Sequence, residues 1–272
     1  ANTSGRDNTF MGEDSGYNND DGDDNTFIGS TAGRTNTTGY RNTFVGNEAG
    51  YDNTNGHHNT AVGDSAGVDA SDGVYNTYLG AGAGAANEHG DHNTFVGARA
   101  GWDNNRTNST ITANRNTYLG SFCGYTNRTG NDNVGMGTFA DMTNNARSEM
   151  VFMGAGVRVS QTGVVAIGYS AEGRGDYGIS LGWNAETDIN GDRSIAIGYD
   201  VNVNGRNTIG MGHEADIDGR YSNIIGNDNE GDGDYSIGLG NNLEIDEDSV
   251  IAIGNLVEVD SVGAIGLGHR AS

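Results

Sequence analysis

The 272-residue sequence contains no proline and no lysine, and it has a single cysteine, Cys123. Proline lacks the backbone N–H that a strand paired on both sides must donate, so its absence fits a chain rich in paired strands. One cysteine excludes an intrachain disulfide framework. No apolar run approaches the roughly 18 residues of a membrane span, and no signal-peptide pattern occurs. We therefore expect no membrane insertion by this segment and expect any anchor or export signal to lie outside it.

Basic residues are also scarce. The chain has 37 acidic residues against 14 basic ones, all of them arginine, and a formal charge of −23. Phosphate backbones and anionic lipids need a basic surface, so this charge argues against nucleic acid or a membrane surface as the partner. An acidic composition without lysine resembles that of halophilic proteins, in which salt screens the self-repulsion. We expect a saline or calcium-rich habitat; an acidic surface kept for solubility alone is the alternative.

Glycine is abundant, with 47 copies, but it has no three-residue period, which excludes collagen. One glycine, here called the anchor glycine, recurs 17 times directly after an aliphatic residue. The anchor glycines are Gly12, Gly29, Gly46, Gly63, Gly80, Gly97, Gly120, Gly137, Gly154, Gly168, Gly182, Gly198, Gly212, Gly226, Gly240, Gly254 and Gly268. Their spacing is 17 as far as Gly97, then 23, 17 and 17, and then 14 at every step except one of 16 before Gly198. A short persistent period is typical of stacked coils in which each repeat contacts only its neighbours.

The sequence therefore predicts an all-β parallel β-solenoid of 17 coils, with mainly 17-residue coils over 1–154 and mainly 14-residue coils over 155–272. Each coil is expected to contain a strand, a turn, a second strand and a second turn. Alternating residues of a strand share a face. We expect the aliphatic residue before the anchor glycine, and the residue two positions before that, to point inward.

The residue between them is then expected to point outward. It is mostly aromatic early in the chain, as in Phe27 and Phe44, and mostly tiny later, as in Ala166 and Gly210. A regular apolar or tiny outer column predicts contact with another chain. The change in size then predicts that the two halves meet their partners at different distances from an assembly axis.

Four motifs near the C-terminus carry a family resemblance: GVVAIG at 163–168, SIAIG at 194–198, SIGLG at 236–240 and VIAIG at 250–254. This pattern resembles the head repeats of YadA-like trimeric autotransporter adhesins and covers about residues 155–272. The resemblance implies a left-handed parallel β-roll, a homotrimer and a role in holding surfaces. The Asn-Thr-Phe-x-Gly-x-x-Ala-Gly coils of 8–137 are similar to repeats in bacterial surface proteins and virus tail fibres.

These features predict a structural and adhesive segment of an extracellular fibre, on a cell or virion surface, that binds a host-surface or cell-surface glycan or protein. A receptor-binding virion fibre and a ligand-free surface filament, with chains stacked end to end, are the alternatives. No nucleophile–base arrangement or phosphate loop stands out, so we do not expect an enzyme.

The coil between Gly97 and Gly120 has six extra residues, and insertions in solenoids often carry binding. We expect a ligand-binding site here that includes Asn105 and Arg106. Trp102 falls in one column with Tyr17, Tyr51 and Tyr125, and exposed aromatic rings can stack on sugars. The alternative is that these rings cover the corner of the coil.

Two stretches, 19–24 and 228–234, crowd acidic residues and Asn around glycine turns. Hard oxygen ligands suit Ca²⁺. The candidate ligands are Asp21, Asp23, Asp24, Asp232 and Asp234, although neither stretch has EF-hand spacing. A solvated acidic face is the alternative, and no other cofactor is expected.

Overall fold

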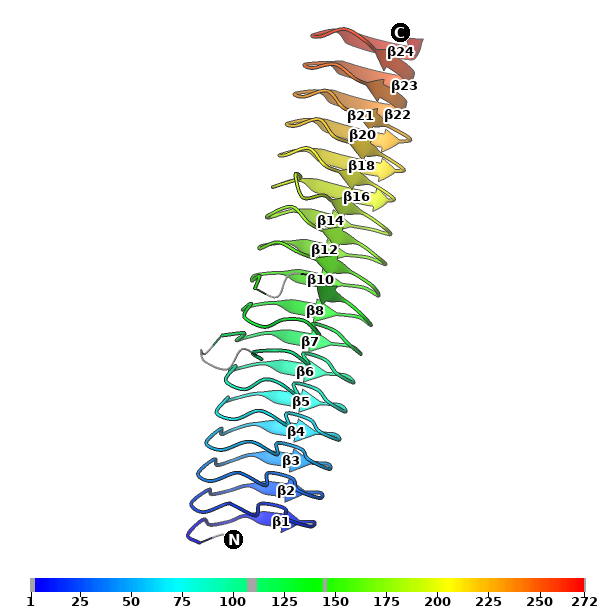
Figure 1. Cartoon of the computed structure of the whole chain (residues 1–272). Helices are drawn as coiled ribbons and strands as arrows, with labels where there is room; N and C mark the ends of the chain where they lie inside the picture. Colours follow the sequence, from blue (N-terminus) through cyan, green and yellow to red (C-terminus); the bar gives the residue numbers. More distant parts are fainter. Residues whose placement is uncertain (1–2, 107–111, 144–145, 272) are drawn as a thin grey trace. The chain divides into compact units, whose positions relative to one another are not determined.

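The computed structural model describes residues 3–106, 112–143 and 146–271, and it confirms an all-β parallel β-solenoid (Figure 1). The described residues form 24 strands in about 18 turns and contain no helix. The chain divides into two compact units, Ala1–Glu149 and Met150–Ser272. Each unit is described by itself below.

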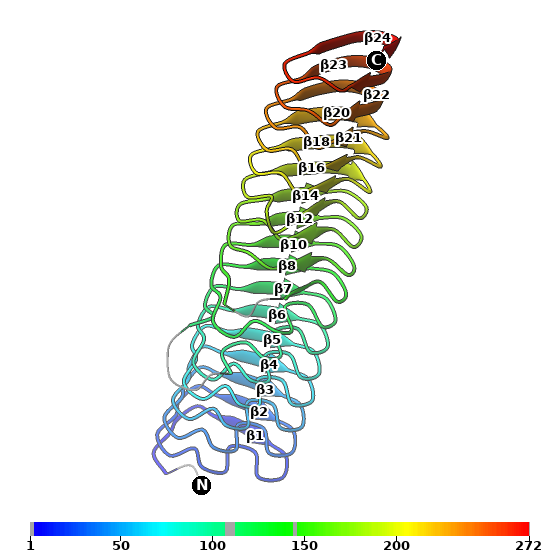
Figure 2. The ribbon, with the colours of Figure 1, turned by 45° about the horizontal axis from the view of Figure 1, so that its top comes forward.

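Unit 1 contains one three-residue strand in each of eight coils. The strands are β1 (Thr9–Met11), β2 (Thr26–Ile28), β3 (Thr43–Val45), β4 (Thr60–Val62), β5 (Thr77–Leu79), β6 (Thr94–Val96), β7 (Thr117–Leu119) and β8 (Val134–Met136), followed by the two-residue β9 (Asp141–Met142). Strands β1 to β8 stack one above the next (Figure 2). They pair in register, so that Phe27 pairs with Phe44. The second strand predicted for the 17-residue coils is wrong, because the residues after the anchor glycine form turns in most of them.

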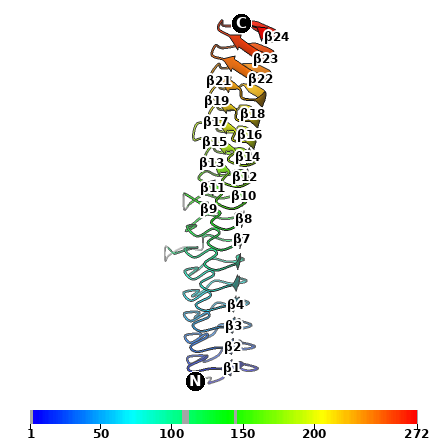
Figure 3. The same cartoon turned by 90° about the vertical axis from the view of Figure 1, so that its right-hand side faces the viewer.

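Unit 2 has two strands in most coils (Figure 3). They are β10 (Val151–Met153), β11 (Arg158–Val159), β12 (Val165–Ile167), β13 (Glu172–Gly173), β14 (Ile179–Leu181), β15 (Glu186–Thr187), β16 (Ile195–Tyr199), β17 (Asn202–Val203), β18 (Ile209–His213), β19 (Asp216–Ile217), β20 (Asn223–Asn227), β21 (Glu230–Gly231), β22 (Ile237–Ile245), β23 (Ile251–Val259) and β24 (Ile265–Ala271). The predicted second strand is confirmed here. It is half-buried, since Val257 and Val259 are buried while Glu258 is exposed.

The faces of the first strand are the reverse of our prediction. Phe44 and Ala166, each two residues before an anchor glycine, are buried. The flanking columns face solvent: Leu79 is 47% exposed and Ile253 is 40% exposed, and Thr43 is exposed as well. Because alternating residues of a strand share a face, the burial of the middle side chain places the aliphatic column outside.

Ring size follows the size of the coil. In unit 1 the inward rings stack along the solenoid, with centroids 5.0 Å apart for Phe10 and Phe27 and 4.9 Å apart for Phe27 and Phe44. Each ring packs against a glycine; a Cβ on Gly50 would lie 2.5 Å from the Phe44 ring. In the shorter coils of unit 2 the same column holds small residues such as Ala166 at every position except Phe152 and Ile224. The change from aromatic to small therefore reflects the width of the core, and our interpretation in terms of distance from an assembly axis was wrong.

Buried asparagines complete the interior of unit 1. The Asn42 backbone N–H donates to Oδ1 of Asn25 at 2.9 Å, and the Asn42 Nδ2 donates to the carbonyl of Gly56 at 2.8 Å. This pattern repeats at Asn25, Asn59 and Asn76, and we call it the asparagine ladder. Hydroxyl groups take the same position in unit 2, at Ser194, Thr208, Ser222 and Ser236. Because each polar group bonds to the next coil, a polar column lies inside at little cost.

The anchor glycine is needed for close stacking. Gly46 has a φ of +140°, and a Cβ there would lie 2.3 Å from the carbonyl oxygen of Gly63 in the next coil. No other residue fits both the conformation and the contact.

Cys123 fills a small buried position in the coil that begins at Gly120, where burial raises the pKa of its thiol to about 12.

Candidate functional site

The predicted aromatic column lies along one corner of unit 1. Tyr17 is 53% exposed, whereas Tyr51, Trp102 and Tyr125 are partly buried. The rings of Trp102 and Tyr125 are parallel, with centroids 6.3 Å apart. Because these two rings face one another along the solenoid, they present mainly their edges to solvent.

Arginines also cover parts of this column. The Arg34 guanidinium lies 5.3 Å from the centroid of the Tyr17 ring and 5.7 Å from that of Tyr51, and it donates to the Tyr51 hydroxyl at 3.2 Å. The Tyr51 hydroxyl is the main cause of the raised pKa of Arg34. Arg99 lies 5.3 Å from the Trp102 ring. The column thus contains cation–π pairs, and a sugar would have to displace an arginine to stack on the ring face that the arginine covers in Tyr17, Tyr51 or Trp102.

The insertion after Gly97 is described only in part, because residues 107–111 lie outside the described residues. Asn105 is buried, and its Nδ2 donates to the carbonyl of Thr112 at 2.6 Å, which joins the two described ends of the insertion. Arg106 forms an ion pair with Asp103 at 2.9 Å. In this arrangement Asn105 holds the base of the insertion, and only Arg106 of the two is exposed for a ligand.

Four of the five predicted calcium ligands have other partners. Asp21 accepts a hydrogen bond from Ser4, Asp23 accepts one from the backbone N–H of Arg6 at 2.7 Å, and Asp24 pairs with Arg41 at 3.5 Å. In unit 2, Asp234 forms an ion pair with Arg220, which lowers the pKa of that carboxyl. Asp232 is exposed, and its pKa is raised by partial burial and then by Asp218 and Asp246. Within the described ranges, neither set brings three carboxylates within 4.8 Å of one another.

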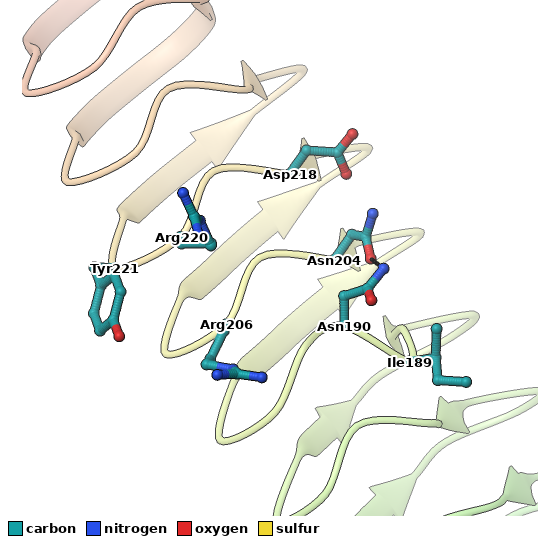
Figure 4. Close-up of a pocket in the computed structure, with 7 residues that line it drawn as sticks. All are labelled: Ile189, Asn190, Asn204, Arg206, Asp218, Arg220 and Tyr221. Atoms are coloured by element: carbon teal, nitrogen blue, oxygen red, sulfur yellow. Dashed lines mark hydrogen bonds between the residues drawn. The ribbon is translucent and has the colours of Figure 1, made fainter.

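A pocket that the sequence interpretation missed lies in unit 2 (Figure 4). It has a volume of about 420 Å³ and is lined by Ile189, Asn190, Asn204, Arg206, Asp218, Arg220 and Tyr221. The signal for it was the single 16-residue step from Gly182 to Gly198, whose extra residues place the exposed Ile189 and Asn190 at one end of the pocket.

Polar groups dominate the pocket. Asn190 Nδ2 donates to Asn204 Oδ1 at 3.0 Å. Arg206 pairs with Asp192 at 3.4 Å, and Arg220 pairs with Asp234, so the positive charge of both arginines is balanced. Amides, guanidinium groups and one carboxylate beside an isoleucine and a tyrosine suit a neutral polyhydroxyl ligand better than an anion.

Exposed aliphatic side chains form two columns on the first strands of unit 2. Ile237, Ile251 and Ile265 pair in register, as do Leu239, Ile253 and Leu267. Leu239 and Ile237 are both 41% exposed. These two columns, here called the aliphatic face, form an apolar stripe of a kind that monomeric proteins rarely leave in solvent.

Comparisons with protein-family models and with curated proteins find no match to this chain. Among the described residues, no helix has the length and apolar character needed to cross a bilayer.

Proposed function

We propose that this chain is a non-catalytic segment of an extracellular structural and adhesive fibre, assembled as a homotrimer through the aliphatic face. The aliphatic face is the observation that carries the proposal. Burying apolar surface contributes about 25 cal/mol per Å², and the repeat places an aliphatic pair in nearly every coil of unit 2. Self-association would cover this stripe along its length, and the resemblance to the head repeats of YadA-like adhesins favours three chains.

Solution mass tests the assembly. Light scattering should give three times the chain mass of 28.3 kDa. Leu239→Asp combined with Ile253→Asp places charge on the aliphatic face and should shift the mass to that of one chain. Asn241→Asp combined with Asn255→Asp adds the same charge to the same two strands, β22 and β23, but removes no aliphatic side chain, and should leave the trimer intact. A wild-type monomer would contradict the proposal.

The adhesive role is supported by the pocket at Asn190 and Asn204. Three copies on one fibre would raise a weak affinity by roughly 10²- to 10⁴-fold through avidity. A glycan array should therefore show binding by wild type that Asn204→Ala removes. The same array on Trp102→Ala tests the aromatic corner. Absence of binding to glycans and to surface proteins would favour the ligand-free filament.

The location on a cell or on a virion depends on sequence that flanks this segment. A membrane anchor would indicate a cell-surface adhesin, and a tail-attachment domain would indicate a virion fibre. The aliphatic face and the pocket are compatible with either location, because a cell-surface adhesin and a virion fibre both need only a trimeric shaft with repeated weak contacts.

A further inference from the structure

We propose that His213, Glu214 and Asp228 in unit 2 form a binding site for one divalent cation of the zinc class. Their possible ligand atoms, one from each side chain, all lie within 4.8 Å of one another. This inference concerns a different surface from the pocket and the aliphatic face, and it does not depend on the proposed function.

The backbone places the three side chains on one exposed turn. His213 ends β18, Glu214 follows it, and Asp228 occupies the equivalent position of the next coil, directly after β20. The Asp228 N–H donates to the carbonyl of His213 at 2.8 Å, which fixes the spacing of the two coils here. Glu214 and Asp228 both adopt left-handed conformations, with φ of 50° and 53°.

The imidazole is held beside the carboxylates. The His213 ring stacks on Tyr199 with centroids 4.9 Å apart and an interplanar angle of 10°. Its Nε2 lies 3.7 Å from a carboxylate oxygen of Glu214. The ring therefore needs little reorientation to share an ion with that carboxylate.

The charges of this turn favour a cation. Glu214 and Asp228 are like charges on successive coils, where direct neighbours of one sign destabilise a sheet. Arginine pairs with Asp192, Glu186 and Asp234 elsewhere in unit 2, but no arginine ion pair reaches Glu214 or Asp228 among the residues that the structure describes. A divalent ion would neutralise the pair and link the two coils.

One imidazole nitrogen and two carboxylates favour Zn²⁺ over Ca²⁺ as the bound ion. Zn²⁺ binds imidazole nitrogen and carboxylate oxygen at about 2.0–2.2 Å, and sites with three protein ligands leave a fourth position to water. Ca²⁺ prefers six to eight oxygen ligands, and this turn supplies a nitrogen and two carboxylates. Rotation of the exposed side chains would bring the three donors to the separations that Zn²⁺ requires.

Titration calorimetry with ZnCl₂ on the full chain tests the site. Wild type should show a site that is lost in His213→Asn and in Asp228→Asn. Both variants suit the fold, because the chain itself has Asn227 in the column of His213 and Asn242 in that of Asp228. Loss of an outer-shell partner costs about 10- to 100-fold in metal affinity, so we expect loss of a direct ligand to weaken binding by at least about 10-fold.

The chain offers a matched control. His269 occupies the same column as His213, but it is followed by Arg270 in place of an acid. His269→Asn should leave the Zn²⁺ isotherm unchanged. Equal weakening by His269→Asn and His213→Asn, or an isotherm that none of the variants alters, would overturn the proposal.

One measurement on wild type needs no variant. The imidazole ¹⁵N resonances of His213 should shift on addition of Zn²⁺ and stay in place with the same concentration of Ca²⁺. Unshifted His213 resonances at saturating Zn²⁺ would refute the site.

Discussion

Replacing Asn42 by alanine removes one member of the asparagine ladder from the interior of unit 1. Oδ1 of Asn42 accepts from the backbone N–H of Asn59 at 2.9 Å, and Nδ2 donates to the Gly56 carbonyl at 2.8 Å. Gly56 keeps a second donor, the Nδ2 of Asn53 at 3.1 Å, whereas the N–H of Asn59 loses the acceptor found in the structure. The variant therefore buries one unpaired donor and loses one further hydrogen bond.

The expected cost follows from these two losses. An unsatisfied buried donor costs about 1–3 kcal/mol, and a lost buried hydrogen bond adds about 1 kcal/mol. Asn42→Ala should therefore lower the free energy of unfolding by about 2–4 kcal/mol. Asn47→Ala makes the same chemical change in the same coil at an exposed amide that donates to Asp64 at 3.0 Å, and it should cost about 0.5 kcal/mol or less.

Urea unfolding followed by circular dichroism measures both variants, and hydrogen exchange locates the effect. Neighbouring coils carry the stability of a solenoid, so the amide of Asn59 should lose protection before amides several coils away. Equal free energies of unfolding for the two variants, or unchanged protection at Asn59, would refute the view that the ladder stabilises the core.

Three further predictions concern a buried amide, a buried carboxyl group and a column of like charges. A second buried column contains Asn36 and Asn53, and the Nδ2 of Asn53 donates to Oδ1 of Asn36 at 2.6 Å. Ala70 takes the next position of this column, so Oδ1 of Asn53 is buried without a hydrogen-bond partner among the described residues. Ala70→Asn should add about 1 kcal/mol to the free energy of unfolding, and a lower urea midpoint would contradict this. Burial raises the pKa of Asp141 to about 6, so its contribution to stability is present below about pH 4 and is lost as the pH rises through about 6. Asp141→Asn should remove that decline, and parallel urea midpoints of variant and wild type across this range would count against it. Glu230, Glu244 and Glu258 pair in register, and Glu258 is the first cause of the raised pKa of Glu244; the thermal midpoint should therefore rise with NaCl from about 0.1 to 2 M, and a salt-independent midpoint would exclude strain from this column.

The period and strand direction could be predicted because both depend on a single feature, the anchor glycine. A residue whose Cβ would meet the next coil at 2.3 Å, as at Gly46, must recur once per coil. The second strand of unit 2 was predictable for a similar reason, since Val257 and Val259 alternate with acids and their burial follows from that alternation.

The orientation of the first strand could not be predicted from hydropathy. Asn42 shares a face with Phe44, and a polar side chain argues for solvent unless its hydrogen bonds are known. Those bonds reach residues 14 and 17 positions away in the sequence, so they exist only once the coils stack. The pocket and the His213 cluster were missed for a related reason, because both combine residues from successive coils whose exposure depends on that orientation.

The reversed orientation separates stability from assembly in this molecule. The asparagine ladder and the stacked rings lie inside, so a change at Asn42 acts on the fold of unit 1. Leu239 and Ile253 lie outside, and their removal from the aliphatic face takes little from the packing within one chain. We therefore expect Leu239→Asp with Ile253→Asp to give a folded single chain, with the wild-type circular dichroism spectrum and reduced mass. Had the aliphatic columns pointed inward, the same pair of aspartates would be buried without partners and the unit would unfold.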